Sequence, residues 1–140
     1  MIVFVFEKKQ EEYSILFKFE KNIEYTKSFE LPYQKVLRKM KFRAKMNVAY
    51  VRTFHNVLST MAKLSKSCAL KLDQDHMYFI INESGVSGFS AWCQMECQNF
   101  FEEHVLEGVT EDAPSIYLEL QPGQMAQSLA LLKTAKGNFF

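Results

Sequence analysis

The stretch 47–66, NVAYVRTFHNVLSTMAKLSK, constrains the fold more than any other part of the sequence. At about 100° per residue its apolar residues share one broad face, as in an amphipathic helix: Val51, Phe54, Leu58, Met61 and Ala62. The opposite arc is about 80° wide by the same arithmetic and holds no carboxylate. Its residues are polar: Arg52, Asn56, Ser59, Lys63 and Lys66. Asn47 is suited to cap the first turn. The sequence therefore predicts a helix with one buried face, and its basic arc is either an ordinary solvated surface or a surface that meets an anion.

Charge is segregated along the chain although the net charge is only +1. Seven Lys and Arg residues and no acid lie between Lys41 and Lys71, whereas ten acids and no Lys or Arg lie between Leu72 and Leu132. Such a domain has a positive side and a negative side if the two segments occupy different surfaces. The 140 residues suffice for one domain, and an apolar content of 48% with 13 Phe supplies its core.

Neither a signal peptide nor a transmembrane segment is recognisable. The apolar start, 1–6, lacks the basic lead-in and the length of a signal peptide, and no apolar run reaches the roughly 20 residues that cross a bilayer. Three cysteines without a secretory signal favour reduced thiols inside the cell. We therefore expect a soluble intracellular protein without membrane contact.

Strand-like runs occupy most of the remaining chain. They predict strands at 2–6, 13–19, 23–29, 40–46, 68–73, 76–83, 89–96, 102–109 and 115–120. The run 40–46, MKFRAKM, alternates strictly between apolar and basic residues, as a half-buried strand does. Charged clusters at 7–12 and 20–22 are the expected turns between the first three runs.

A second helix is predicted from Pro122, which suits a first turn whose N–H groups lack partners. Its apolar stripe is Met125, Leu129 and Leu132, and Gly137 is a candidate C-terminal cap. Two helices on one face of a curved antiparallel sheet make an α+β domain. The short turns predict that each strand pairs with its neighbour in the sequence.

No catalytic or nucleotide-binding motif stands out. The sequence lacks G-x-x-x-x-G-K-[ST], G-x-G-x-x-G, H-E-x-x-H and G-x-S-x-G. The segment 73–75, Asp-Gln-Asp, begins like a calcium loop, but the required Gly and Glu are missing at the sixth and twelfth positions, which favours a turn. Cys93, Cys97 and His104 lack a fourth metal ligand, so the two thiols are expected to be buried and free. We predict no metal, no cofactor and no enzymatic activity.

The segment 94–101, QMECQNFF, almost spells the peptide by which replication proteins dock on sliding clamps. That peptide has Gln, two residues, an aliphatic residue, two residues and two aromatics, and Cys97 occupies the aliphatic position. Since the segment lies within a predicted sheet, we expect Phe100 and Phe101 to anchor a bend between two strands.

From Met40 onward, successive segments are similar to those of one known family. They are, in order, MKFRAKM, AKLSKSC, LKLDQDHMYFII, the strand with Trp92 and Cys93, QNFF at 98–101, EGVTEDAPSIYLEL and SLALLKTA. This part of the chain resembles the start of the hydroxyurea-sensitive (Hus-one type) subunit of the nine-one-one checkpoint sliding clamp. The resemblance covers residues 40–140, whereas residues 1–39 match nothing recognised and form a strand-rich N-terminal extension of unknown role.

The resemblance implies a fold and a function. The family is similar to proliferating cell nuclear antigen: subunits of two clamp domains form a three-subunit ring whose helices line the hole. The resemblance implies a non-enzymatic subunit that a clamp loader places on damaged DNA together with the two other checkpoint clamp subunits. The implied role is to support checkpoint signalling and repair. The implied location is the nucleus, with the cytoplasm as a second location. Because a complete clamp domain has further strands after its second helix, residues 40–140 are predicted to be a truncated first clamp domain.

Two functional hypotheses remain open. In the first, Arg52, Lys63 and Lys66 face the phosphates of double-stranded DNA in the ring channel without reading bases, and Lys133 and Lys136 are weaker candidates. In the second, the chain is a truncated protein-interaction fragment that pairs with clamp subunits without encircling DNA. Neither hypothesis involves a small-molecule substrate or a membrane.

Overall fold

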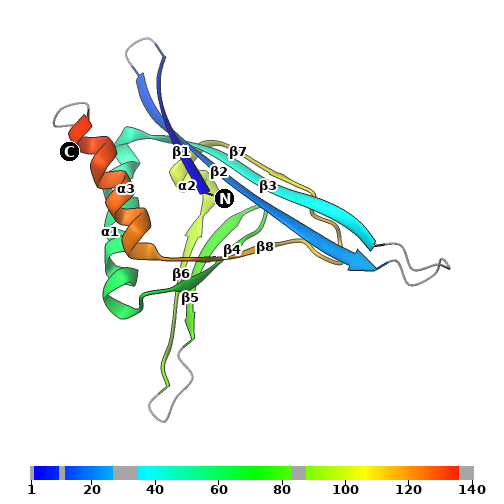
Figure 1. The fold of residues 1–140 in the computed structure, drawn as a ribbon. Coiled ribbons are helices and arrows are strands. Elements are labelled where there is room, and N and C mark those ends of the chain that lie inside the picture. The colour runs from blue at the N-terminus through cyan, green and yellow to red at the C-terminus, as the bar shows by residue number, and fades with distance from the viewer. Residues whose placement is uncertain (1, 10–11, 27–34, 83–87, 136–140) are drawn as a thin grey trace.

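The computed structural model describes residues 2–9, 12–26, 35–82 and 88–135, and the side chains of 16–22, 38–82 and 88–131. Its elements in chain order are β1 (Ile2–Lys9), β2 (Glu12–Thr26), β3 (Lys35–Asn47), α1 (Val48–Leu64), β4 (Cys68–Leu72), β5 (His76–Asn82), β6 (Ser90–Glu96), α2 (Cys97–Phe100), β7 (Phe101–Glu107), β8 (Ile116–Leu120) and α3 (Pro122–Ala135). The strands form two antiparallel four-stranded sheets, sheet A in the order β1-β2-β3-β7 and sheet B in the order β6-β5-β4-β8 (Figure 1). Helices α1 and α3 stand side by side at one end of both sheets, which makes the fold α+β.

Helix α1 forms where the amphipathic pattern predicts it. Its buried residues are Val51, Phe54, Leu58 and Met61. Asn47 caps the helix, because its Oδ1 accepts a hydrogen bond of 2.9 Å from the Ala49 N–H. The predicted apolar face and the predicted cap are therefore both confirmed.

The helix ends earlier than predicted. The Ser65 N–H donates to the Met61 C=O at 3.0 Å and closes the last turn. Ser65 itself has an extended backbone, with φ −153° and ψ 154°. Since α1 ends at Leu64, Lys66 lies in the connection to β4 and not on the helix where it was expected.

Strand β3 shows the alternation predicted for 40–46. Its buried side chains are Met40, Phe42, Ala44 and Met46. The basic residues between them lie on the opposite face of sheet A, and each has at least one polar or charged residue of β2 or β7 as its cross-strand partner. β3 begins at Lys35, earlier than predicted, because β2 pairs with it along its whole length.

Among the described residues before β3, 2–9 and 12–26 form two strands, β1 and β2, where three were predicted. The turn expected at 20–22 is absent, and these residues continue β2 instead. Their charges find partners within the fold: Glu20 Oε2 lies 2.9 Å from Lys39 Nζ, and Lys21 Nζ donates to the Tyr117 C=O of β8 at 2.6 Å. The prediction of three separate strands was wrong because a charged cluster without Gly or Pro does not oblige the chain to turn.

Strand pairing follows the sequence only in part. β4, β5 and β6 pair with their sequence neighbours, as do β1, β2 and β3. The helical turn α2 then carries the chain from sheet B to sheet A, where β7 pairs with β3, and β8 returns to sheet B beside β4. The single curved sheet of the prediction is therefore two sheets, because alternation identifies a strand but not its partner.

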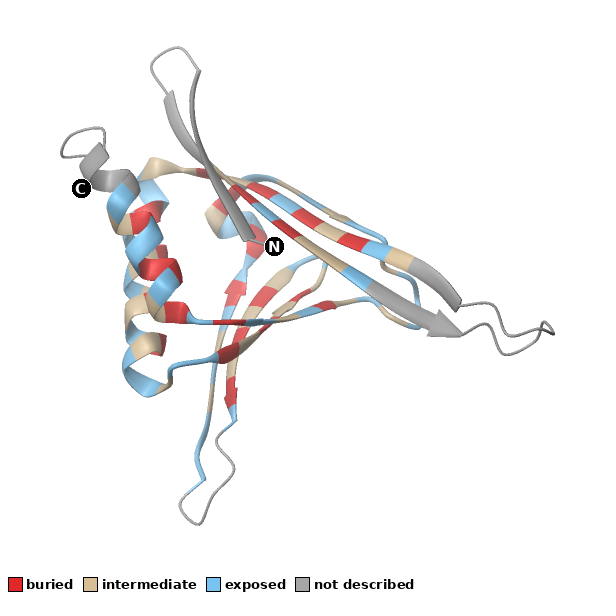
Figure 2. Cartoon of the chain, in the orientation of Figure 1, coloured by how far each residue is buried: buried red, intermediate tan, exposed pale blue. Residues whose placement is uncertain are grey.

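The core lies between the inward faces of the two sheets and the buried face of α1 (Figure 2). Phe54 of α1 contacts aromatic rings of both sheets, with centroid distances of 5.2 Å to Phe17 and 6.1 Å to Phe79. Helix α3 approaches α1 closely, and a Cβ at Gly123 would lie 3.7 Å from the Ala62 Cβ. One continuous core therefore joins all the layers.

Helix α3 begins at Pro122, as predicted. Met125 and Leu129 of its predicted stripe are buried. The Leu132 side chain and the expected cap at Gly137 lie outside the described residues. Among the helices that the structure describes, none is long and apolar enough to cross a membrane.

Candidate nucleic-acid interface

The solvent-facing side of α1 carries two basic residues in line. Arg52 and Lys63 are both exposed. They are eleven residues apart, which places them within about 20° of each other around the helix and about 16 Å apart along its axis. Asn56 between them is exposed and Ser59 is half-buried. Lys66 is exposed beyond the end of the helix, so the structure brings together two of the three predicted cations on one line.

The layer formed by α1 and α3 contains no carboxylate. Neither helix includes an Asp or a Glu. Among the described side chains of α3, the exposed ones are uncharged: Gln124, Gln127, Ser128 and Leu131. Lys133 belongs to α3, but its side chain is outside the described set, and Lys136 lies outside the described residues altogether. With no acid to offset the cations, this layer presents a positive field to solvent.

The cations of the interface lie apart from the described carboxylates. Within the described side chains, no ion pair of 4.0 Å or less joins Arg52, Lys63 or Lys66 to a carboxylate. Lys63 lies in the last turn of α1, where a cation also interacts favourably with the helix dipole by about 0.3–1 kcal/mol. Because the helix dipole favours a cation at Lys63 without any ligand, Arg52 is the stronger indication that this surface binds an anion.

A polar cluster that the sequence did not reveal fixes the start of α1 to sheet A. Asn47 Nδ2 donates to Glu102 Oε1 of β7 at 2.9 Å, and Lys45 Nζ lies 3.2 Å from Glu102 Oε2. The hydrogen bond from Asn47, with a further contribution from Lys45, holds the pKa of Glu102 below its ordinary value. Asn47 and Glu102 are 55 residues apart, so no local pattern connects them. Asn47 therefore both caps α1 and sets its direction relative to sheet A.

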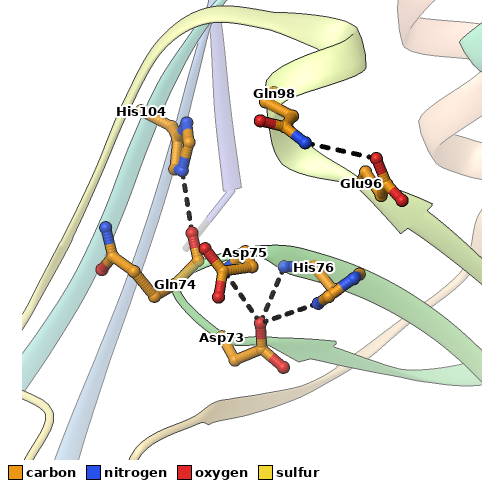
Figure 3. Close-up of polar contacts among 7 residues, drawn as sticks. All are labelled: Asp73, Gln74, Asp75, His76, Glu96, Gln98 and His104. Atoms are coloured by element: carbon orange, nitrogen blue, oxygen red, sulfur yellow. Dashed lines mark hydrogen bonds and ion pairs between the residues drawn. The ribbon is translucent and has the colours of Figure 1, made fainter.

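The connection between β4 and β5 is a turn, as predicted. Asp73 Oδ1 accepts hydrogen bonds from the N–H groups of Asp75 at 3.0 Å and His76 at 2.7 Å (Figure 3). His104 Nε2 of sheet A donates to the Gln74 C=O at 2.8 Å and thereby joins the two sheets. In the described part of the chain, no group of three or more His, Cys, Asp or Glu is placed to hold a metal ion.

The three thiols are free, with Cys68 and Cys97 buried and Cys93 half-buried. Burial raises the pKa of Cys68 to about 11. Burial, with the charges of Asp73 and Asp75, raises the pKa of Cys97 to about 12. Both buried thiols therefore stay protonated at neutral pH and are poor nucleophiles and poor metal ligands.

The segment 94–101 is folded into the core and is not an accessible docking peptide. Cys97 and Phe101 are only 1% and 5% exposed. Phe100 packs against Tyr50 of α1, with ring centroids 6.4 Å apart. The predicted bend is confirmed, because the helical turn α2 connects β6 to β7 at this point.

Comparison with known proteins identifies most of this fold. The model of a family described as Hus1-like protein matches residues 40–138. Checkpoint protein HUS1 of Homo sapiens is 36% identical over 99 residues, covering 69% of this chain and 35% of the human protein. Checkpoint protein Hus1-like of Drosophila melanogaster is 31% identical over 97 residues, covering 67% of this chain and 35% of the fly protein. The chain thus spans about a third of the length of these relatives. It belongs to the Hus1-like family, whose members have the clamp fold of proliferating cell nuclear antigen.

Proposed function

We propose that this chain is a non-enzymatic subunit, or part of one, of the heterotrimeric checkpoint clamp that encircles DNA at sites of damage. Its partners are then the two other clamp subunits, the clamp loader and double-stranded DNA, and its place of action is the nucleus. Membership of the Hus1-like family supports the assignment. The single structural observation that carries the DNA contact is a helix layer with aligned cations, Arg52 and Lys63, and no carboxylate.

The proposed contact is electrostatic and independent of base sequence. Arg52 and Lys63 approach the phosphate backbone from α1, and Lys66 approaches it from the adjoining connection. Each neutralised phosphate releases condensed counterions, so three contacts contribute a log-log salt slope of about −3 on B-DNA. Contacts of this kind hold a ring on DNA while leaving it free to slide, which suits a clamp and needs no catalytic group.

The test uses the assembled ring with its loader and compares two triple variants of equal charge change. The first triple variant reverses the charge of the proposed interface and combines Arg52→Glu, Lys63→Glu and Lys66→Glu. The second triple variant is the control and makes the same charge change on the outward faces of the two sheets. It combines Lys18→Glu, Arg43→Glu and Lys71→Glu.

We expect the first triple variant to lose loading on nicked duplex DNA and most of the salt dependence of binding, while the second retains both. Wild-type loading by the first triple variant would refute the assignment of these residues to DNA.

A second function, that of a protein-interaction fragment, is favoured by a different observation. β1 and β2 enlarge sheet A from outside the family match, and β1 forms one edge of that sheet. Such an edge can accept a strand from another chain. Co-purification with the other two clamp subunits in high salt, with no DNA retained in low salt, would support this function over the first.

A further inference from the structure

The face of sheet A that points away from the core carries three side chains in one row. Lys18 of β2, Arg43 of β3 and Val105 of β7 are cross-strand neighbours in register. All three are exposed, Val105 by 42%. Lys41 lies two residues from Arg43 on the same face. These four side chains and the carboxylates of Glu20 and Glu107 border a groove of about 220 Å³.

The two cations that face each other in this row, Lys18 and Arg43, repel one another. Lys18 and Arg43 are direct partners, and like charges directly opposite one another destabilise a sheet. Within the described side chains, no ion pair joins Lys18, Lys41 or Arg43 to a carboxylate. Glu20, the cross-strand partner of Lys41, lies 2.9 Å from Lys39, and the pKa of Glu20 is lowered first by the Lys39 hydrogen bond and also by the charge of Lys41. The repulsion between Lys18 and Arg43 has no such offset among the described side chains. A bound anion would therefore relieve a repulsion that the fold itself leaves in place.

The neighbouring rows limit the size of that anion. On one side Lys45 is in register with Glu103, and on the other side Lys41 is in register with both Glu20 and Glu107. A continuous phosphate backbone laid along the strands would meet the carboxylates of both neighbouring rows, whereas one isolated phosphate over Lys18 and Arg43 would have only Glu20 and Glu107 beside it, at the Lys41 end of the groove. The arrangement favours a single compact dianion over a nucleic acid.

We propose that this groove binds a phosphorylated serine or threonine of a partner peptide. The guanidinium of Arg43 can grip a phosphate with two parallel hydrogen bonds, and Lys18 and Lys41 add charge-assisted bonds from either side. Basic clusters of this kind are a recurring means of recognising phosphorylated segments. Val105 provides an apolar contact for the peptide residue next to the phosphate.

The site combines residues from inside and outside the family match. Lys18 precedes the matched residues 40–138, whereas Arg43 lies within them. The position of Lys18 is fixed by its neighbours in β2, Phe17 and Phe19, which are both fully buried. The site therefore depends on the N-terminal strands of this chain and on neither ring assembly nor DNA.

The test titrates the full chain into a fluorescent degenerate peptide library with one fixed phosphoserine followed by Leu, and into its unphosphorylated twin. We expect saturable anisotropy changes with the phosphorylated library alone. Lys18→Gln should weaken binding about tenfold, the loss of one charge-assisted hydrogen bond, and Arg43→Gln, which removes two, should weaken it more than that. Lys71→Gln removes the same charge from the outward face of sheet B and should leave binding unchanged.

A stability measurement separates ligand binding from a structural role. Without peptide, Lys18→Gln should raise the midpoint of urea unfolding slightly because it relieves the repulsion with Arg43. With the phosphopeptide present, the further rise in the midpoint should be smaller for Lys18→Gln than for the wild type. A merely structural Lys18 would lower the midpoint.

Three results would overturn the proposal. The first is equal binding of the phosphorylated and unphosphorylated libraries. The second is wild-type affinity in Arg43→Gln. The third is displacement of the phosphopeptide by duplex DNA through contacts that depend on Arg43, which would assign the groove to nucleic acid.

Discussion

The ring of Phe17 in β2 lies edge-on to the ring of Phe54 in α1, with centroids 5.2 Å apart and an interplanar angle of 78°. Phe17 also contacts Phe101 of β7, at a centroid distance of 5.7 Å. Phe17 precedes the residues that match the Hus1-like family, and Phe54 lies among them. The N-terminal strands therefore contribute to the same core that supports the basic face of α1.

Phe17→Ala should lower the free energy of unfolding by about 3–5 kcal/mol, because it removes a fully buried ring and leaves a cavity against α1. Urea unfolding followed by circular dichroism measures the change, since Trp92 is 71% exposed and its fluorescence would report poorly on the core. Asn22→Ala, at an exposed position of the same strand, should stay within about 0.5 kcal/mol of the wild type. Similar values for the two variants would mean that β2 is not part of the cooperative core.

The parts of the fold that follow from local patterns could be predicted from the sequence. The period of α1 and the alternation of β3 placed Phe54 and Phe42 in the core because each pattern is complete within one element. The same pattern put Arg52 and Lys63 on the opposite side of α1, where the structure shows them exposed. Lys66 was misplaced because helix ends are the least determined part of a periodic pattern.

The parts that depend on distant pairing could not be predicted. The hydrogen bond from Asn47 to Glu102 and the row that contains Lys18 and Arg43 exist only because β7 and β2 flank β3 in one particular register. A shift by one residue would turn every side chain of a strand to the other face, and no signal within the strand excludes it. Candidate sites on sheets therefore required the structure, whereas the candidate site on α1 did not.

Gly108 and Gly123 should respond to alanine substitution in opposite directions. Gly108 has φ +80°, and a Cβ there would clash with the backbone oxygen of Lys39, so Gly108→Ala should destabilise the fold by about 1–3 kcal/mol. A Cβ at Gly123 would make an ordinary contact with Ala62, and Ala is the better helix former by about 1 kcal/mol. Gly123→Ala should therefore be neutral or stabilising in thermal unfolding. A neutral Gly108→Ala would show that the chain after β7 can move away from β3.

The contribution of Glu102 to stability should depend on pH. Its pKa in the folded chain lies below the ordinary value of 4.5, first because Asn47 donates a hydrogen bond to it. Its stabilising effect is therefore complete above pH 4.5 and is lost as the pH falls through the lower folded-state pKa. Glu102→Gln should reduce the free energy of unfolding at pH 7 by about 1 kcal/mol or less, because the side chain is exposed, and the difference should shrink in acid.

Urea unfolding at a series of pH values measures this effect, and Asn47→Ala should reduce the pH dependence in the same way. Asn47→Ala should also lose about 1 kcal/mol at every pH, because the cap of α1 is removed as well. Glu119→Gln, at an exposed position of β8, is the control and should follow the wild-type profile. A Glu102→Gln profile parallel to that of the wild type would contradict the assignment.

The three thiols should react with iodoacetamide at very different rates. At pH 8 a thiol with a pKa of about 11, such as Cys68, is ionised in about one molecule in a thousand, and Cys97, with a pKa of about 12, still less. Cys93 is only half-buried, so although burial raises its pKa too, it should be alkylated first. Mass spectrometry of timed samples gives the order, and in urea all three should react at similar rates because the burial that separates them is gone. Rapid labelling of Cys97 in the folded chain would show that the turn between β6 and β7 opens readily, and would weaken the description of α2 as a fixed bend of the core.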